Sequence, residues 1–362
     1  MTSTTRPYGQ ITGLETLGLF GAVLTMPFVQ ALRLLKKPFN EHDRVRTWRR
    51  VKADAGFGYA VSVLNAYQIQ FVDGSTTKVY EKWAPTVEVK PDIEKIDEGA
   101  NLLWATPRKR KRVLVYLHGG GYVLPAPPFS IGFWKHVTDN LNKKDEDTSL
   151  VIVEYGLYPK VEFPVPLKQM IATVKHLFSA GYKPEDILLV GDSAGAGLIV
   201  QLFAHILHPV PGVPEFSIPS PLAGTVLISP FVAMDVTSPS FTSNAHSDIF
   251  SVDFFVHLRD LVKPTIPESL LHYVEPVKAP REWFKGIDKL VSRVYITSGD
   301  SEVLRDDIKQ FSEEIRAFHK DATWVNIPNG THNEPYGTLV AGEPEVGEWP
   351  TKVADWIAAA SR

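Results

Sequence analysis

Apolar, strand-like runs alternate with helix-length stretches along most of this 362-residue chain. The runs lie at 111–117, 150–155, 187–190, 225–229, 293–297 and 324–327. Two of the intervening stretches, 167–180 and 305–320, have the length of helices, and the second carries apolar residues at helical spacing. This alternation predicts an α/β fold, with a mostly parallel central sheet covered by helices on both faces. In such sheets the functional site lies at the carboxyl ends of the strands.

A hairpin is predicted ahead of the first of these runs. Residues 67–72 and 78–83 are rich in aromatic and β-branched side chains, and they flank the turn-forming pair Asp73-Gly74. We therefore expect two antiparallel strands at one edge of the sheet.

The N-terminal segment has three interpretations. Residues 16–32 carry no charge, but this run of 17 includes Pro27 and Gln30 and falls just short of the ~20 apolar residues of a spanning helix. It forms a hydrophobic cap helix over a substrate pocket, an interfacial helix that docks residues 14–35 peripherally on a membrane, or a true span. Eight Lys and Arg against two acids follow between Arg33 and Lys52, so an inserted segment would leave the body of the protein in the cytosol.

Composition, net charge and cysteine content exclude some classes of protein but do not identify one. With 44% apolar and 22% charged residues the chain can bury a large core. A net charge of −3 gives no general electrostatic case for nucleic-acid binding, and the basic run 108–112 is expected to be a solvated turn at the end of the sheet away from the site. The chain has no cysteine, which excludes disulfides, thiolate metal sites and a cysteine nucleophile and fits a cytoplasmic location.

A serine stands between glycines in the sequence Gly191-Asp192-Ser193-Ala194-Gly195, directly after a predicted strand and before the apolar stretch 196–203. A strand, a sharp turn and a helix form the geometry of a nucleophile elbow. The glycines suit a strained turn whose helix must pass close to the strand. We expect the Ser193 hydroxyl at the top of the sheet, and Asp192 facing away from it as a structural residue. An ordinary strand-to-helix turn is the alternative.

Upstream, the strand at 111–117 runs into His118-Gly119-Gly120-Gly121. Three successive glycines leave backbone N–H groups without side-chain cover, which suits an oxyanion hole. A plain glycine turn is the alternative, and a phosphate-binding loop is excluded because no Gly-Lys-Ser/Thr follows. His118 is expected to shape this loop.

A serine nucleophile needs a base and an acid that orients the base. Of eleven histidines, His332 is predicted as the base because it follows the last strand at its carboxyl end. His319 lies in the stretch 305–320, where we expect a solvated surface residue. The loop after the strand at 293–297 offers Asp300 and Glu302 as the acid, and spacing does not choose between them.

These motifs resemble the hormone-sensitive lipase family of α/β-hydrolases. The matching stretches are His118-Gly119-Gly120-Gly121, Gly191-Asp192-Ser193-Ala194-Gly195, Tyr155-Gly156-Leu157-Tyr158-Pro159 with Phe163-Pro164, and Leu227-Ile228-Ser229-Pro230-Phe231. The family's Asp-Pro-Leu-Arg-Asp pattern corresponds to Glu302-Val303-Leu304-Arg305-Asp306, so the resemblance favours Glu302 as the acid. It also implies an oxyanion hole from the N–H groups of Gly120, Gly121 and Ala194. At finer level the chain resembles a fungal branch that includes steryl acetyl hydrolases.

The resemblance implies an N-terminal cap segment over residues 1–60 and an α/β-hydrolase catalytic domain over 61–362, with a cap insertion at about 231–284. Large apolar residues in that insertion suit either an apolar substrate or the cap's own core: Phe250, Phe254, Phe255, Leu258, Leu261, Leu271, Tyr273 and Trp283.

The expected function is hydrolysis of a small or hydrophobic carboxylic ester through an acyl-enzyme, with Ser193, Glu302 and His332 as the catalytic residues. No metal or organic cofactor is expected, and the only expected partners are the small-molecule ester and a membrane surface. The sequence does not indicate an oligomeric state. The alternatives are an acyltransferase or a thioesterase that releases a product, and a non-catalytic binding protein of the same fold, against which the presence of His332 argues.

Overall fold

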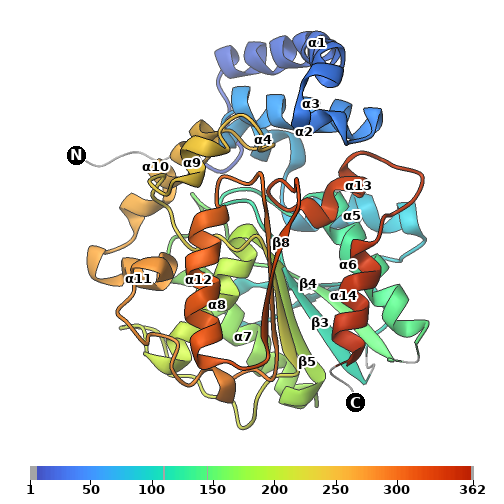
Figure 1. The fold of residues 1–362 in the computed structure, drawn as a ribbon. Coiled ribbons are helices and arrows are strands. Elements are labelled where there is room, and N and C mark those ends of the chain that lie inside the picture. The colour runs from blue at the N-terminus through green and yellow to red at the C-terminus, as the bar shows by residue number, and fades with distance from the viewer. Residues whose placement is uncertain (1–5, 109–110, 145, 360–362) are drawn as a thin grey trace.

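The computed structural model describes residues 6–108, 111–144 and 146–359, and it is built around one eight-stranded sheet (Figure 1). The strand order is β1-β2-β4-β3-β5-β6-β7-β8. The strands are β1 (Ile93–Lys95), β2 (Asn101–Trp104), β3 (Arg112–Leu117), β4 (Thr148–Glu154), β5 (Ile187–Asp192), β6 (Gly224–Ile228), β7 (Val294–Gly299) and β8 (Ala322–Ile327). From β4 to β8 all neighbouring strands are parallel, whereas β1 and β2 are antiparallel to their neighbours. The predicted α/β class and the six predicted strands are confirmed.

Helices cover both faces of the sheet (Figure 1). On one side lie α6 (Pro128–Asn142) and α14 (Trp349–Ala358), and on the other lie α7 (Val165–Ser179), α8 (Ser193–Leu207) and α12 (Arg305–Phe318). Successive side chains of a strand point to opposite faces. In β3, Val115 therefore joins the core under α7 and α8 while Tyr116 joins the core under α6, and both are fully buried. This double burial explains why the central strands appear in the sequence as continuous apolar runs.

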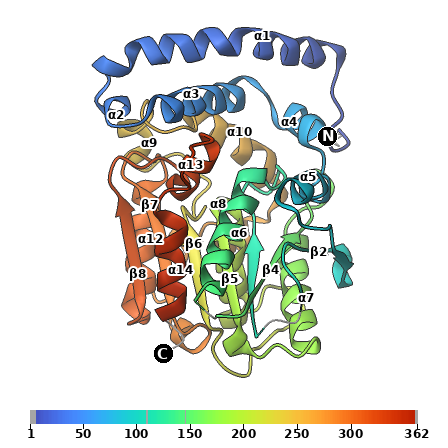
Figure 2. The same ribbon diagram turned by 90° about the vertical axis from the view of Figure 1, so that its right-hand side faces the viewer.

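The N-terminal helices form a separate layer beyond the carboxyl ends of the parallel strands (Figure 2). They are α1 (Gly13–Lys36), α2 (Glu41–Arg44), α3 (Trp48–Val63) and α4 (Ala66–Asp73), whereas α5 (Thr76–Trp83), which follows them, packs on α6 and β2. The outermost is α1, which packs along α3, and α3 lies between α1 and the sheet. Among the described residues, only the stretch 13–39 is long and apolar enough to cross a membrane, judged by length and composition alone.

The predicted hairpin at 67–83 is wrong, because these residues form α4 and α5. Asn65 caps α4 in a capping box with Gln68, and Ser75 caps α5. Gly74, expected in a hairpin turn, instead ends α4 with a φ of 78°. Within α4, Gln70 is buried and donates to the carbonyls of Val123 and Tyr158. An antiparallel edge exists, but β1 and β2 make it.

The segment between β6 and β7 contains three helices, α9 (Ser240–Ser243), α10 (Val252–Val262) and α11 (Leu271–Val274), and it leaves the sheet at the same end as the N-terminal layer. Of these, α10 contacts α3 whereas α11 packs on α8. The last short helix, α13 (Gly337–Val340), follows the loop after β8. Single 3₁₀ turns occupy Lys37–Phe39, Ala84–Val87, Asp97–Gly99, Pro184–Asp186, Lys263–Thr265, Glu268–Leu270, Pro276–Lys278, Ile287–Lys289 and Glu334–Tyr336.

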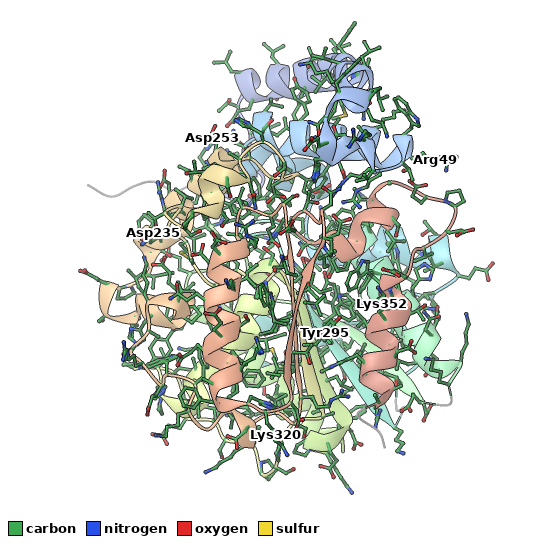
Figure 3. The ribbon with its side chains drawn as sticks, viewed as in Figure 1. Arg49, Asp235, Asp253, Tyr295, Lys320 and Lys352 are labelled. Atoms are coloured by element: carbon green, nitrogen blue, oxygen red, sulfur yellow. The ribbon has the colours of Figure 1, made fainter. Side chains whose placement is uncertain are left out.

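The two ends of the sheet have different surroundings (Figure 3). Arg49 on α3 and Asp253 on α10 lie beyond one end, Tyr295 lies within the sheet, and Lys320 lies at the opposite end. The basic run 108–112 also belongs to the end opposite α3, because it precedes β3. Within it Arg108 pairs with Asp92, whereas residues 109 and 110 lie outside the described part of the chain.

Candidate active site

Ser193 occupies the turn between β5 and α8 with a φ of 48°, in the left-handed region that a serine rarely adopts. Its neighbour Gly195 lies so close to β3 that a Cβ there would be 2.0 Å from the Leu117 carbonyl oxygen. Close packing of the helix against the strand thus requires glycine at position 195. Ser193 is 7% exposed and lines a pocket at the carboxyl ends of the strands, so the hydroxyl faces the pocket and not open solvent.

The glycine-rich loop lies beside this turn. Gly120 has a φ of 108°, and a Cβ there would be 2.5 Å from the Leu124 carbonyl oxygen. Gly119, Gly120 and Gly121 line the same pocket as Ser193. Ala194 is in the first turn of α8, where backbone N–H groups lack partners within the helix. The structure therefore brings the three residues expected to form an oxyanion hole around Ser193.

His118 is buried behind the glycine loop and does not line the pocket. Its Nδ1 lies 2.7 Å from the Gly119 carbonyl oxygen, its Nε2 lies 3.0 Å from Oγ1 of Thr76, and its ring stacks on Tyr155. Burial lowers the pKa of His118 to about 4, so the ring is neutral and holds the loop by hydrogen bonds.

His332 lies in the loop after β8, with its Nδ1 2.6 Å from Oε1 of Glu302. Both side chains are buried. The second carboxylate oxygen of Glu302 accepts hydrogen bonds from the Gly299 N–H at 2.7 Å and the Ser229 hydroxyl at 2.9 Å. The structure brings together Ser193 and His332, which line one pocket, and His332 and Glu302, which are in contact.

Asp300, the other acid considered, points elsewhere. Its side chain is 54% exposed and accepts a hydrogen bond from Nδ2 of Asn326. Spacing from the strand does not separate two acids in one loop, whereas the tertiary fold gives only Glu302 a contact with His332.

A second acid, Asp248, contacts the histidine loop and was not found by sequence reasoning. Its carboxylate accepts hydrogen bonds from the N–H groups of His332, Val303 and Ile249. Burial, together with the charge of Glu302, raises the pKa of Asp248 to about 6. Asp248 lies in the insertion after β6, and no motif marks it in the sequence.

The electrostatic surroundings favour a charged His332. Burial by itself lowers the pKa of His332, but the carboxylates of Glu302, Asp248 and Asp192 outweigh burial and raise it above its ordinary value. An imidazolium formed during a reaction is therefore stabilised where it forms.

Asp192 makes the contacts of a structural residue, but it also lines the pocket of Ser193 and so does not face wholly away from it. Its Oδ1 accepts hydrogen bonds from the hydroxyls of Tyr116 at 2.7 Å and Tyr336 at 3.1 Å, and its Oδ2 accepts one from Nδ2 of Asn333 at 3.1 Å. Burial raises the pKa of Asp192, and these donors oppose that rise. The carboxylate thus ties the base of the serine turn to the histidine loop.

The pocket encloses about 900 Å³ of space, its open mouth included. Its walls come from α3, α4, the glycine loop, the insertion after β6 and α13. Phe250 packs edge-on against the His332 ring and against Phe57 of α3. Apart from Arg50, Asp54 and Asp73, the residues beyond the reacting groups are mostly apolar, as in pockets for apolar ligands.

The apolar residues expected in the insertion divide between two roles. Phe250, Phe254 and Leu258 line the pocket. The others do not: Tyr273 donates to the His208 carbonyl, and Trp283 stacks on the His208 ring. The N-terminal cap is likewise divided, because α3 lines the pocket whereas no residue of α1 does.

The expectation for His319 is wrong. It is 3% exposed, lies just past the end of α12, and its Nε2 is 2.7 Å from the Val291 carbonyl oxygen. The helix ends two residues earlier than the pattern predicts, so this histidine turns inward. Within the described ranges no three His, Asp or Glu side chains are grouped to hold a metal ion.

Comparison with known proteins shows which family the central part of the chain matches. Residues 114–335 match the model of the family described as alpha/beta hydrolase fold. An esterase of Acinetobacter venetianus is 25% identical over 236 residues, which cover 64% of this chain and 69% of that protein. An acetyl-hydrolase of Streptomyces hygroscopicus is 27% identical over 233 residues, or 63% of this chain and 70% of that protein.

Solved structures share the fold. An esterase described as belonging to the bacterial hormone-sensitive lipase family superposes with a TM-score of 0.64 at 20% identity and covers 87% of this chain and 99% of its own. Carboxyl esterase 2 of the mycorrhizal fungus Tuber melanosporum gives 0.61 at 21% identity, with 75% and 88% covered. The predicted α/β-hydrolase fold is confirmed, while the finer resemblance to a fungal branch stays a prediction.

Proposed function

We propose that this chain, which belongs to the alpha/beta hydrolase fold family, is a serine hydrolase that cleaves small or apolar carboxylic esters. One observation carries the proposal: Ser193 and His332 line one pocket, and Glu302 is hydrogen-bonded to His332 away from open solvent. The names of the relatives, an esterase and an acetyl-hydrolase, support the same reaction class.

In the proposed reaction, Nε2 of His332 takes the proton from the Ser193 hydroxyl as Oγ attacks the ester carbonyl carbon. The tetrahedral oxyanion is held by the N–H groups of Gly120, Gly121 and Ala194. His332 then returns the proton to the departing alcohol, and an acyl-serine remains. Water attacks this acyl group with His332 again as the base, which releases the carboxylic acid and regenerates Ser193.

Glu302 would act through the histidine. By accepting the Nδ1–H of His332 it selects the tautomer in which Nε2 is free to take a proton, and it stabilises the imidazolium. Its other oxygen is fixed by Gly299 and Ser229, which supports a role as a rigid orienting group.

The substrate class follows from the pocket walls. Phe57, Phe129, Phe250 and Phe254 offer apolar surface for an acyl chain or an apolar alcohol. We expect turnover to favour apolar esters over charged ones of similar size.

The first experiment is hydrolysis of p-nitrophenyl esters of increasing chain length, with Ser193→Ala beside Ser179→Ala, an exposed serine at the end of α7. We expect Ser193→Ala to abolish turnover and the control to keep it. A fluorophosphonate should add to the wild-type serine, as seen by mass spectrometry. Turnover or adduct formation that persists in Ser193→Ala would contradict the proposal.

Acyl transfer and thioester cleavage would pass through the same acyl-serine as ester hydrolysis. Analysis of the products therefore distinguishes these three reactions. Assays with a competing alcohol or amine should yield the free acid as the main product. A dominant transfer product would reassign the reaction to an acyltransferase, and preference for a thioester over the matching oxygen ester would reassign it to a thioesterase.

We also propose that α1 docks the protein on an anionic membrane surface. Its outward side chains are apolar and highly exposed, for example Leu14 at 81%, Leu24 at 72% and Phe28 at 76%. Exposed Lys36 and Arg44, at and just after its C-terminal end, suit anionic headgroups. Among the described residues, α1 is covered by protein on its inner side only, and an apolar face of this kind is unusual on an uncovered side.

Interfacial binding fits better than a span because the inner side of α1 is bonded to the rest of the protein. Arg33 makes two hydrogen bonds with the buried Asp43, and Gln68 of α4 donates to the Glu15 carbonyl. A spanning α1 would break these bonds.

Co-sedimentation with vesicles of phosphatidylserine and phosphatidylcholine tests the docking. We expect binding that falls with salt and is lost in Leu24→Glu/Phe28→Glu, while Val87→Glu, remote from α1, keeps it. Absence of binding, with light scattering showing a dimer that the double substitution dissociates, would assign the face to a second copy of the chain.

A further inference from the structure

Two arginines around the start of α3 reach the loop that carries His332. Arg50 donates to both oxygens of the Glu334 carboxylate, with Nη1–Oε1 and Nη2–Oε2 distances of 2.9 Å each. Its Nε donates to Asp54 at 2.7 Å, and Arg46 bridges Asp54 at 2.6 Å and Glu334 at 3.1 Å. We call these four residues, Arg46, Arg50, Asp54 and Glu334, the charge cluster.

The charge cluster is electrically balanced and nearly inaccessible. Its side chains are between 1% and 17% exposed. Two positive and two negative groups cancel, so the cluster does not attract an ionic ligand. Buried ion pairs add little net stability relative to apolar packing, because desolvation opposes their attraction. What a bidentate arginine supplies is a fixed geometry between the elements that it joins.

Glu334 organises the histidine loop from within. Its Oε2 accepts the Thr331 N–H at 2.9 Å and the Thr331 hydroxyl at 3.1 Å, so the backbone turn that contains His332 folds around this carboxylate. The orientation of the turn therefore depends on where Arg50 holds Glu334.

A second set of contacts joins the segment before α3 to the loop after β8 and to the loop after β7. Arg46 donates to the Asn329 carbonyl at 2.5 Å, and Nδ2 of Asn329 donates to the His42 carbonyl at 3.1 Å. The His42 ring lies 3.2 Å from the hydroxyl of Ser301, which precedes Glu302 in the chain. Residues 42–54 thus touch both the loop of Glu302 and the loop of His332.

We propose that Arg50 is a positioning residue, which through Glu334 holds the His332 loop in the geometry that the reaction needs. This inference rests on the proposed function. Arg50 itself lines the pocket, but all of its nitrogens bond to protein groups, so it acts through the loop and not on the substrate. Small displacements of a general base cost large factors in rate, which makes such a support measurable.

The test compares Arg50→Met and Arg50→Lys with Arg49→Met. Arg49 is an exposed neighbour whose side chain donates to the Gly342 carbonyl and not to Glu334. With a p-nitrophenyl ester we expect Arg50→Met to lower kcat ~tenfold or more with KM nearly unchanged. Arg50→Lys should recover part of kcat, because lysine keeps the positive charge but cannot make the bidentate contact with Glu334. Arg49→Met should match the wild type.

Proton NMR gives a readout that does not depend on turnover. A short Nδ1–H···Oε1 bond between His332 and Glu302 places its proton far downfield, and we expect this resonance to broaden or vanish in Arg50→Met and to remain in Arg49→Met. If Ser193→Ala kept activity, the proposed function would be wrong. The resonance would still show whether Arg50 positions the His332 loop. A folded Arg50→Met with wild-type kcat and an unchanged resonance would overturn the inference.

Arg50→Met also leaves buried carboxylates unbalanced, which endangers folding. The variant Arg50→Met/Glu334→Met removes one charge of each sign and leaves the Arg46–Asp54 pair intact. We expect it to fold and to remain low in kcat with the NMR resonance broadened. Wild-type kcat in this folded variant would show that the charge cluster has no positioning role.

Discussion

His332 is joined to Glu302 by a 2.6 Å contact between Nδ1 and Oε1, and the fold shields both side chains from solvent. A glutamate is one methylene longer than the aspartate of the resembling family, and here both of its carboxylate oxygens accept hydrogen bonds. Gly299 and Ser229 donate to its second oxygen, so the extra length ends in two hydrogen bonds.

Replacing Glu302 by Gln should lower kcat by roughly a thousandfold or more. An amide either donates to Nδ1 or leaves it unpaired, and so favours the wrong tautomer of His332. Steady-state kinetics on a p-nitrophenyl ester measures the effect.

The matched control for Glu302 is Asp300→Asn, in the same loop but exposed and paired with Asn326. We expect its kcat to stay within about twofold of the wild type, as for most surface substitutions. If Asp300→Asn lowered kcat strongly and Glu302→Gln did not, Asp300 would be the acid that orients His332.

The pH dependence of kcat/KM should reflect the carboxylates around His332. The base must be neutral, so activity falls as pH drops through the pKa of His332, which lies above its ordinary 6.5 because Glu302, Asp248 and Asp192 outweigh burial. In Asp248→Asn one of these negative charges is lost, and the acidic limb should move to lower pH by roughly half to one unit.

Asp253→Asn is the control for this pH shift, because Asp253 is an exposed acid on α10. Its profile should overlay that of the wild type. A limb that stays in place in Asp248→Asn would mean that Asp248 does not influence the titration of the base.

Gly120→Ala should lower kcat by about a hundredfold or more. The added Cβ would lie 2.5 Å from the Leu124 carbonyl oxygen at a φ of 108°, so the loop must move and the proposed oxyanion donors move with it. Gly132→Ala in α6 meets only Nε1 of Trp83 at 3.8 Å and should retain activity. Equal kcat for the two variants would remove Gly120 from the oxyanion hole.

Tyr116→Phe should destabilise the fold most at alkaline pH. The hydroxyl donates to the buried Asp192, and loss of a hydrogen bond to a charged group costs about 1.5–3 kcal/mol of unfolding free energy. Burial already raises the pKa of Asp192 above 3.8, and loss of this donor raises it further. The deficit is therefore complete where Asp192 is ionised and shrinks as pH falls and the carboxyl is protonated.

Urea unfolding at several pH values measures this dependence. Tyr273→Phe is the control, because the Tyr273 hydroxyl donates to the uncharged His208 carbonyl. Its deficit should not change with pH. A pH-independent loss in Tyr116→Phe would show that Asp192 stays in one protonation state throughout.

Sequence patterns predicted the parallel strands well because each is buried on both faces, which leaves an unbroken apolar run such as that of β3. They failed at 67–83, where aromatic and β-branched residues on both sides of Asp73-Gly74 indicated a hairpin and the residues form two helices. Gln70 is polar because it satisfies two buried carbonyls, and such a requirement is set by distant parts of the chain.

The sequence by itself determined the alternation of strands and helices, the serine turn with its glycines, and the place of His332 after the last strand. These features depend on neighbouring residues in the chain, on the spacing of buried positions along each element and on backbone sterics. Only the tertiary structure decided that Glu302 and not Asp300 meets His332, that Asp248 joins them, and that α3 lines the pocket while α1 faces outward. Each of these contacts joins residues from separate elements, and the direction of a side chain across such a gap is fixed by packing, which a local pattern does not encode.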